Sequence, residues 1–175
     1  MNSDEELMNM VAGGDLKALE MLMERYRKSL FSFLFRIMQN TATAEDIAQD
    51  TFLRIYDSRK KYKNGMIFRN WLFTIGHNLA IDELRKSSKV IFESDEVITL
   101  LQSPDISATD NIVAEIVKKA IGKLPTMQQS VILLREYEGF NYHEIAGITG
   151  ISEEAARVNC HRAKVALKKM LAELM

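Results

Sequence analysis

Residues that break helices or form disulfides are scarce in this chain: its 175 residues include 1 cysteine, 2 prolines and 8 glycines. A single cysteine excludes a disulfide framework within the chain and is typical of a reducing cytosol. So few prolines and glycines favour helices over a turn-rich β-sandwich. No apolar run approaches the roughly 20 residues that a membrane span requires, and the acidic start at residues 1–6 lacks the apolar segment of a signal peptide. We therefore expect a cytoplasmic, all-helical protein without membrane insertion.

Catalytic patterns are also missing from the sequence. The three histidines are dispersed, and neither a Glu-x-x-His motif nor a phosphate-binding glycine loop is present. Cys160, His161 and His143 are residue types that bind zinc, but adjacent residues on a helix point about 100° apart, which argues against a shared site. The sequence therefore predicts no enzymatic activity, no metal site and no cofactor.

Charge divides the chain into three parts. Residues 1–90 carry 14 Lys/Arg against 12 Asp/Glu, residues 91–112 carry none against 5, and residues 113–175 carry 9 against 7. Between residues 54 and 89 the balance is 9 basic to 3 acidic, which suits a polyanionic partner. An acidic stretch between two mildly basic blocks is typical of a linker.

Apolar residues recur at steps of three and four along most of the chain, which predicts helices. The expected helices are a short one after the Ser3–Glu6 capping box, a long one after Asp15, and then 43–58, 68–86, 112–123, 126–137, 142–149 and 153–175. We predict two small helical domains, 1–90 and 112–175, joined by a flexible acidic linker at 91–111. Such a tether fixes no spacing, so the effective concentration of one domain at the other's DNA site is expected to be low until a scaffold holds both.

The segment 141–158 has the pattern of a helix-turn-helix. Asn141 and Ser152 are suited to cap its two helices, and Gly150 permits the turn between them. On the second helix, one face is apolar, and the opposite face carries the groups that read base edges, with cations for phosphates beside them. These outward residues are Glu154, Arg157, Val158, His161 and Arg162, flanked by Lys164 and Lys168.

Two earlier helices also segregate their residues. In the helix 43–58, an acidic and amide face includes an exposed leucine, which suits a protein contact better than a solvated surface. This face consists of Asp46, Gln49, Asp50 and Leu53. In the helix 68–86, aromatic, amide and charged groups share a stripe behind a basic loop, a combination suited to unpaired bases and their phosphate backbone. These residues are Trp71, Asn78, Asp82 and Arg85, with Phe68 at the helix start and Lys61, Tyr62 and Lys63 in the loop.

Three segments in order, 44–56, 68–86 and 124–164, resemble the bacterial extracytoplasmic-function (ECF) sigma factors. The resemblance implies a region 2-like four-helix domain and a region 4-like helix-turn-helix domain. It assigns contact with core RNA polymerase to Asp46, Gln49, Asp50 and Leu53. It also implies an anti-sigma partner, which allows retention at the inner membrane.

The same resemblance assigns two sets of residues to promoter DNA. Recognition and opening of the −10 element fall to Lys61, Tyr62, Lys63, Phe68, Trp71, Asn78, Asp82 and Arg85. Recognition of the −35 element falls to Ser152, Glu154, Arg157, Val158, His161, Arg162, Lys164 and Lys168. An alternative interpretation is a stand-alone helix-turn-helix regulator with an N-terminal helical partner-binding domain.

Overall fold

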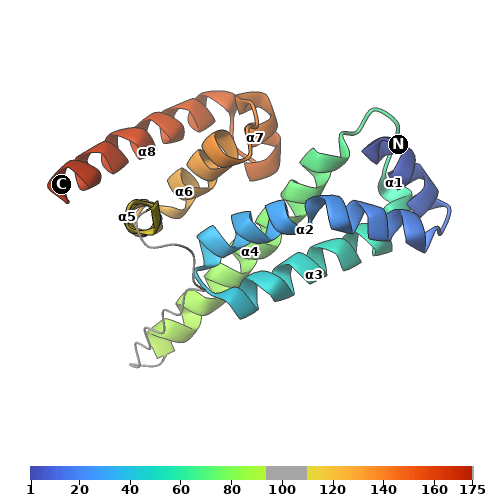
Figure 1. Cartoon of the computed structure of the whole chain (residues 1–175), viewed down its shortest axis with the longest axis horizontal. Coiled ribbons are helices and arrows are strands. Elements are labelled where there is room, and N and C mark those ends of the chain that lie inside the picture. The colour runs from blue at the N-terminus through green and yellow to red at the C-terminus, as the bar shows by residue number, and fades with distance from the viewer. Residues whose placement is uncertain (94–109, 175) are drawn as a thin grey trace.

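The computed structural model describes residues 1–93 and 110–174, and every regular element in these ranges is helical, which confirms the predicted all-α class (Figure 1). The N-terminal domain comprises α1 to α4 and the C-terminal domain α5 to α8. Their bounds are α1 Asp4–Ala12, α2 Leu16–Met38, α3 Thr41–Asp57, the 3-10 turn η1 Arg59–Lys61, α4 Phe68–Glu93, α5 Asp110–Gly122, α6 Thr126–Ile132, the π-helical turn η2 Leu133–Tyr137, α7 Tyr142–Thr149 and α8 Glu153–Glu173.

Several helix bounds differ from the prediction, since α5 begins two residues earlier than expected and the predicted helix 126–137 is divided into α6 and the π-helical turn η2. Helix α3 begins two residues earlier than expected, because the Asn40 side chain caps it by accepting from the Thr43 backbone N–H at 2.9 Å. Helix α4 continues to Glu93, beyond its predicted end at residue 86, and so includes the first three residues of the predicted linker. Residues 94–109 of the predicted linker lie outside the described residues, and its last two residues belong to α5.

In the N-terminal domain, the apolar stripes of α2, α3 and α4 meet in one core. Leu30, Phe33 and Leu34 of α2 are fully buried, as is Leu72 of α4. Gly76 brings α4 close to α2, because a Cβ atom there would lie 3.0 Å from Cδ1 of Leu30. Burial of each large apolar side chain contributes roughly 1.5–3 kcal/mol relative to its exposure, so this core accounts for the stacking of the three helices.

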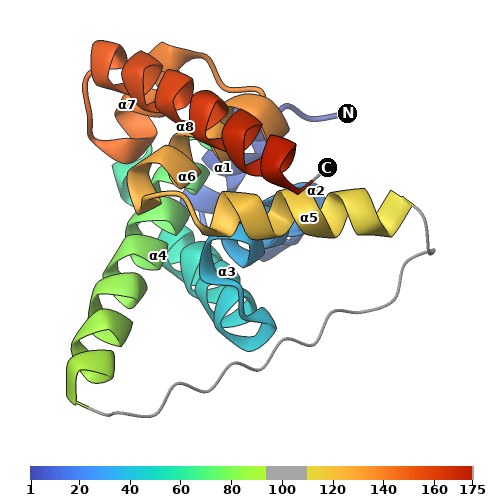
Figure 2. The same ribbon diagram turned by 90° about the vertical axis from the view of Figure 1, so that its left-hand side faces the viewer.

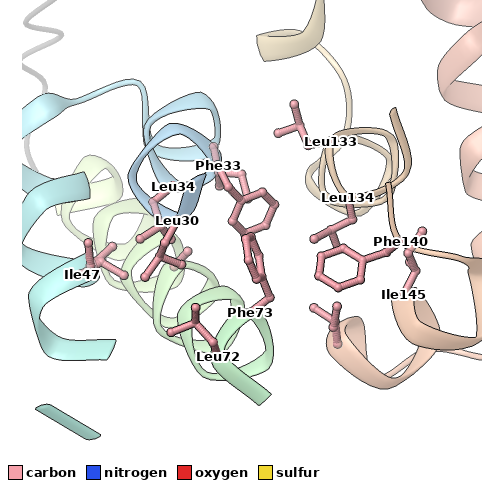
Figure 3. Packing of buried hydrophobic residues seen from close by; sticks show 14 of the residues in the cluster. Leu30, Phe33, Leu34, Ile47, Leu72, Phe73, Leu133, Leu134, Phe140 and Ile145 are labelled. Carbon is pink, nitrogen blue, oxygen red and sulfur yellow. The ribbon is translucent and has the colours of Figure 1, made fainter. Parts of the chain in front are cut away.

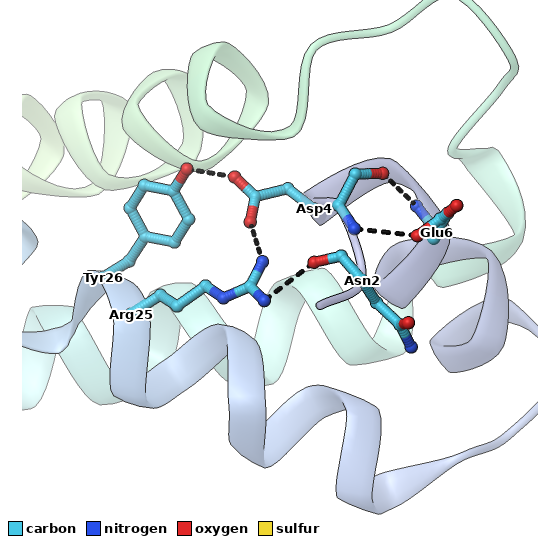
Figure 4. A network of polar contacts seen from close by, with 6 residues as sticks. Asn2, Asp4, Glu6, Arg25 and Tyr26 are labelled. Carbon is cyan, nitrogen blue, oxygen red and sulfur yellow. Dashed lines mark hydrogen bonds and ion pairs between the residues drawn. The ribbon is translucent and has the colours of Figure 1, made fainter.

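Helix α1 is fixed to the same core by a polar network (Figure 4). The Asp4 carboxylate accepts hydrogen bonds from the Tyr26 hydroxyl and from the Arg25 guanidinium, the latter at 2.7 Å. Arg25 also donates to the Asn2 carbonyl at 2.8 Å. Burial, followed by the bond to Asp4, raises the pKa of Tyr26. Leu7, Met8 and Val11 are fully buried beneath this network, so α1 is an integral part of the domain.

In the C-terminal domain, the helix-turn-helix forms as predicted. The Asn141 side chain accepts from the Glu144 N–H at 2.8 Å, and Ser152 accepts from the Ala155 N–H at 3.0 Å. Gly150 ends α7 with a φ of 75°, in the left-handed region that glycine adopts without steric cost. The inward residues of α8 are fully buried at three positions, namely Ala156, Cys160 and Ala163.

The two domains pack directly against each other, an arrangement that the predicted linker neither required nor excluded (Figure 2). Phe33 and Phe73 face Phe140 and Leu134 across the boundary (Figure 3). The rings of Phe73 and Phe140 lie 5.2 Å apart at 70°, the edge-to-face arrangement that aromatic pairs favour. The sequence pattern contained no information about this contact.

Arg69 is the polar centre of this boundary. Its guanidinium donates to the Glu138 carbonyl, lies 3.6 Å from the Glu138 carboxylate and stacks 3.9 Å from the Phe140 ring centroid. Glu138 also accepts from the Ser29 hydroxyl at 2.7 Å. One residue of α4 therefore holds the loop between η2 and α7.

His77 adds a titratable group to the boundary. Its Nε2 lies 2.9 Å from the Ser130 hydroxyl, and both side chains are buried. Burial lowers the pKa of His77 to about 4, so the imidazole is neutral at pH 7. Its Nδ1 atom is buried without a hydrogen-bond partner, and a proton added there would be poorly solvated.

We expect the boundary to weaken as the pH falls. When the domains separate, His77 returns to water and to its ordinary pKa of about 6.5. The separated state then binds more protons than the closed state between about pH 6.5 and 4. The free energy that favours the closed state therefore falls by up to roughly 3 kcal/mol as the pH drops through that range. Small-angle X-ray scattering across this range should show an increasing radius of gyration.

The control for this titration is His77→Gln, which keeps a polar side chain but removes the ionisable group. Its radius of gyration should respond less to pH than that of the wild-type chain. An identical response in the two proteins would assign the effect to carboxylates elsewhere.

Candidate protein and nucleic-acid interfaces

The acidic face of α3 is open to solvent. Asp46, Gln49, Asp50 and Leu53 are all exposed, and Leu53 retains 55% of its accessible surface. The opposite face of the same helix is buried against α2 and α4. Helix α3 lies on the side of the N-terminal domain away from the C-terminal domain (Figure 1). Domain closure therefore leaves this face accessible to a protein partner.

In the basic segment before α4, the cationic side chains are exposed and the aromatic side chain is buried. Lys61 and Lys63 are exposed, whereas Tyr62 is 9% exposed. The Tyr62 hydroxyl donates to the Met66 carbonyl at 2.7 Å, and its ring lies 5.4 Å from that of Trp71. Burial, with the charges of Glu5 and Asp4, raises the pKa of Tyr62 to about 12. In this arrangement Tyr62 shapes the loop, and only its lysine neighbours are accessible to phosphates.

Phe68 is fully buried and is therefore not accessible for stacking on a base. Its ring lies 5.6 Å from the Tyr26 ring, at the point where α4 begins inside the core. Sequence reasoning placed it among the DNA-contacting aromatics because ring chemistry alone does not reveal which way the first turn of a helix faces. In this structure its role is to anchor α4.

The stripe along α4 is only partly continuous. Asn78, Asp82 and Arg85 are exposed, and the last two form an ion pair at 3.8 Å. An exposed pair of this kind contributes little to stability, so both charges remain accessible. Trp71 is half-buried and lines an open groove of about 290 Å³ between α4 and α7, together with Ile67 and His143.

The outward face of α8 has the arrangement expected from the sequence. Exposed along it are Glu154, Arg157, Val158, His161, Arg162, Lys164 and Lys168. Ser152 differs from these because its hydroxyl caps the helix. Lys164 already has an anionic partner: its ammonium lies 2.7 Å from the Glu136 carboxylate, and this bond raises the pKa of Lys164.

Sequence reasoning missed two groups of polar residues. The first is the pair Arg69 and Glu138 at the domain boundary, which are separated by 69 positions and share no motif. The second is a stack in which Tyr142 lies between Arg135 and Arg157. In each case the sequence showed only that a polar residue lies beside an apolar stripe. This pattern does not identify the residue with which it pairs.

The described residues, 1–93 and 110–174, contain no group of three His, Cys, Asp or Glu side chains placed to hold a metal ion. Cys160 is buried and His161 is exposed, so they point to different sides of α8. In these same ranges no helix is both long and apolar enough to cross a membrane.

Comparison with known proteins identifies both domains. Residues 22–90 match the family described as Sigma-70 region 2, and residues 114–167 match Sigma-70, region 4. The RNA polymerase sigma factor YlaC of Bacillus subtilis is 31% identical over 157 residues, covering 87% of this chain and 91% of that protein. CarQ of Myxococcus xanthus is 34% identical over 164 residues, covering 92% and 93%. The ECF sigma factor SigW of Bacillus subtilis is 27% identical over 176 residues, covering 94% of each.

Solved structures show the same fold. CnrH in complex with the cytosolic domain of CnrY superposes with a TM-score of 0.77 at 24% identity, covering 98% of this chain and 99% of that one. The sigma factor RpoE of Bartonella quintana, solved with the anti-sigma factor NepR, gives 0.79 at 24% identity, covering 89% and 98%. The two matched regions and the curated relatives show that the chain belongs to the ECF group of the sigma-70 family of RNA polymerase sigma factors.

Proposed function

We propose that this sigma factor binds core RNA polymerase through α3 and directs it to promoters through α4 and α8. The observation that carries the proposal is the exposed face of Asp46, Gln49, Asp50 and Leu53, which coexists in one chain with a basic helix-turn-helix face. A leucine surrounded by acidic and amide groups suits a basic protein surface with an apolar centre. A stand-alone regulator would not need this face.

In this proposal, α4 and the loop before it act at the −10 element. Asn78 is exposed and bears an amide that can pair with the edge of an unstacked base. Lys61, Lys63 and Arg85 are exposed cations for the phosphate backbone. Trp71 is partly exposed and borders the groove, and an aromatic side chain in this position is suited to stack on an unpaired base. Asp82 lies beside Arg85 in an exposed ion pair, while Tyr62 and Phe68 support the loop from within.

Helix α8 acts at the −35 element. Arg157 is exposed in its first turns, the part of a recognition helix that reaches base edges. Val158, His161 and Arg162 share its face, and Glu154 precedes it. Lys168 lies further along α8 and contacts phosphates. Lys164 also contacts phosphates once its ion pair with Glu136 is replaced by one with DNA. Ser152 holds the helix start through its cap.

The remaining parts of the proposal concern partners and location. Two structural neighbours were solved with proteins bound, one of them the anti-sigma factor NepR. We infer that this chain also has an anti-sigma partner. We further infer that it acts in the cytoplasm, where polymerase is found, and that the anti-sigma partner can retain it at the inner membrane. The chain itself contributes binding and strand opening, and polymerase contributes the chemistry.

The decisive experiment is transcription. Core polymerase, this chain and a library of promoters from the cognate genome should yield specific transcripts and permanganate-reactive thymines near the start sites. Core polymerase without the chain is the control. Tight protection of duplex sites by the chain alone, without transcripts in the presence of core, would favour the stand-alone regulator.

Asn78→Ala should slow strand opening, because it removes the amide proposed to hold an unstacked base. On duplex templates the rate of opening should fall by about tenfold. On pre-melted templates the effect should be small. Permanganate reactivity over time measures it. Asn9→Ala makes the same change at an exposed position of α1 and should have no effect. Equal losses on both templates would assign Asn78 to a step other than opening.

A further inference from the structure

Tyr142 lies between two guanidinium groups that come from different elements. It is the first residue of α7, and its ring centroid is 4.7 Å from Cζ of Arg135 in η2 and 5.3 Å from Cζ of Arg157 in α8. Both distances are within the range in which a cation is attracted to an aromatic face. The helix-turn-helix therefore has a side-chain stack running from η2 to the recognition helix.

Arg135 and Tyr142 are fixed to the domain, whereas the third member of the stack, Arg157, is exposed. Arg135 donates from Nη1 to the Phe140 carbonyl at 3.0 Å. Interaction with the Cys160 side chain, which is fully buried, raises the pKa of Tyr142. The tyrosine ring is partly buried and packs against the hydrophobic core, while Arg157 remains exposed at the surface.

Arginine reads a base by presenting two parallel N–H groups in one plane, so the orientation of that plane decides whether the contact forms. An exposed arginine explores many rotamers, and restricting them before binding reduces the entropy lost on binding. A ring against the guanidinium limits this motion without using its N–H donors, which leaves the whole donor edge available for DNA.

We propose that Tyr142 is a positioning residue that orients the Arg157 guanidinium for recognition of the −35 element. The inference rests on the proposed function, in which Arg157 reads a base. Tyr142 acts on promoter choice through Arg157 and contacts no base itself.

The test is a double-mutant cycle on the complex of core polymerase with this chain. Its binding preferences are measured on a DNA library randomised at the −35 element, with wild type, Tyr142→Leu, Tyr142→Phe, Arg157→Ala and the double variant Tyr142→Leu/Arg157→Ala. Arg157→Ala should lower discrimination at one or two base positions by about tenfold. Tyr142→Leu should lower it at the same positions by about fivefold, and Tyr142→Phe, which keeps the ring, by less than about twofold. In the Arg157→Ala background, Tyr142→Leu should add nothing.

Other results would overturn the inference in distinguishable ways. A uniform loss of affinity across all sequences in both Tyr142 variants would make the hydroxyl a phosphate contact. A full additional effect of Tyr142→Leu in the Arg157→Ala background would make the ring a structural support, and thermal unfolding of the isolated variants would register that. If Arg157→Ala leaves sequence preference unchanged, the assigned role of Arg157 fails and the inference with it. If the wild-type complex selects no −35 sequence, the proposed function itself fails.

Discussion

The double variant Asp50→Lys/Leu53→Ala should lose most of its affinity for core RNA polymerase. Both side chains are exposed on the α3 face, and Leu53 is the one large apolar group in the set Asp46, Gln49, Asp50 and Leu53. Removing an apolar anchor and reversing a charge opposite a basic surface should weaken binding by roughly 2 kcal/mol or more, which is about 30-fold in Kd. Fluorescence anisotropy with labelled core polymerase measures this change.

The chain provides a matched control on α2. Glu20→Lys/Leu16→Ala makes the same two kinds of change at exposed positions, and Leu16 is 57% exposed, close to the value for Leu53. This control should bind core polymerase with wild-type affinity, and circular dichroism should show unchanged helicity in both variants. Wild-type affinity in the α3 variant would place the polymerase contact on another surface.

Arg69→Ala should open the contact between the two domains. The change removes a charge-assisted hydrogen bond to the Glu138 carbonyl and the stacking on Phe140, and it leaves the largely buried Glu138 carboxylate with Ser29 as its remaining partner. Hydrogen bonds to charged groups contribute about 1.5–3 kcal/mol and cation–π contacts about 0.5–2 kcal/mol, so closure should weaken by about 2–4 kcal/mol. Small-angle X-ray scattering should show a larger radius of gyration at pH 7.

The same variant tests what closure does to DNA binding. Helix α7 lies against the first turns of α4 in the closed arrangement, where Trp71 borders the shared groove. Opening should therefore raise the affinity of the free chain for promoter DNA, while its affinity for core polymerase through α3 stays unchanged. Arg27→Ala, at an exposed position of α2, is the control. A wild-type radius of gyration in Arg69→Ala would show that the apolar contacts around Phe73 and Phe140 suffice to hold the domains.

The helices and their faces were predictable because the information for them is local. The box formed by Ser3 and Glu6, the caps Asn141 and Ser152, and the turn at Gly150 depend on residues within a few positions of one another. Periodicity likewise separated the exposed Asp50 and Leu53 from the buried side of α3. The C-terminal end of α4 was not predictable in this way, because the polar residues in the segment 87–93 form helix and linker about equally well.

The contact between the domains and the stack on Tyr142 were decided only by the tertiary structure. Phe73 and Phe140 meet across the boundary, and periodicity cannot tell a face buried within a domain from one buried between two. Phe68 was predicted to contact DNA, whereas in this structure its ring is buried beside Tyr26, because ring chemistry alone does not distinguish the two environments. Arg69 with Glu138, and Arg157 with Tyr142, are pairs formed across distant segments. The sequence thus determined which surfaces this sigma factor has, through short-range periodicity and capping, whereas long-range packing decided which of them are covered and which side chains are held in place.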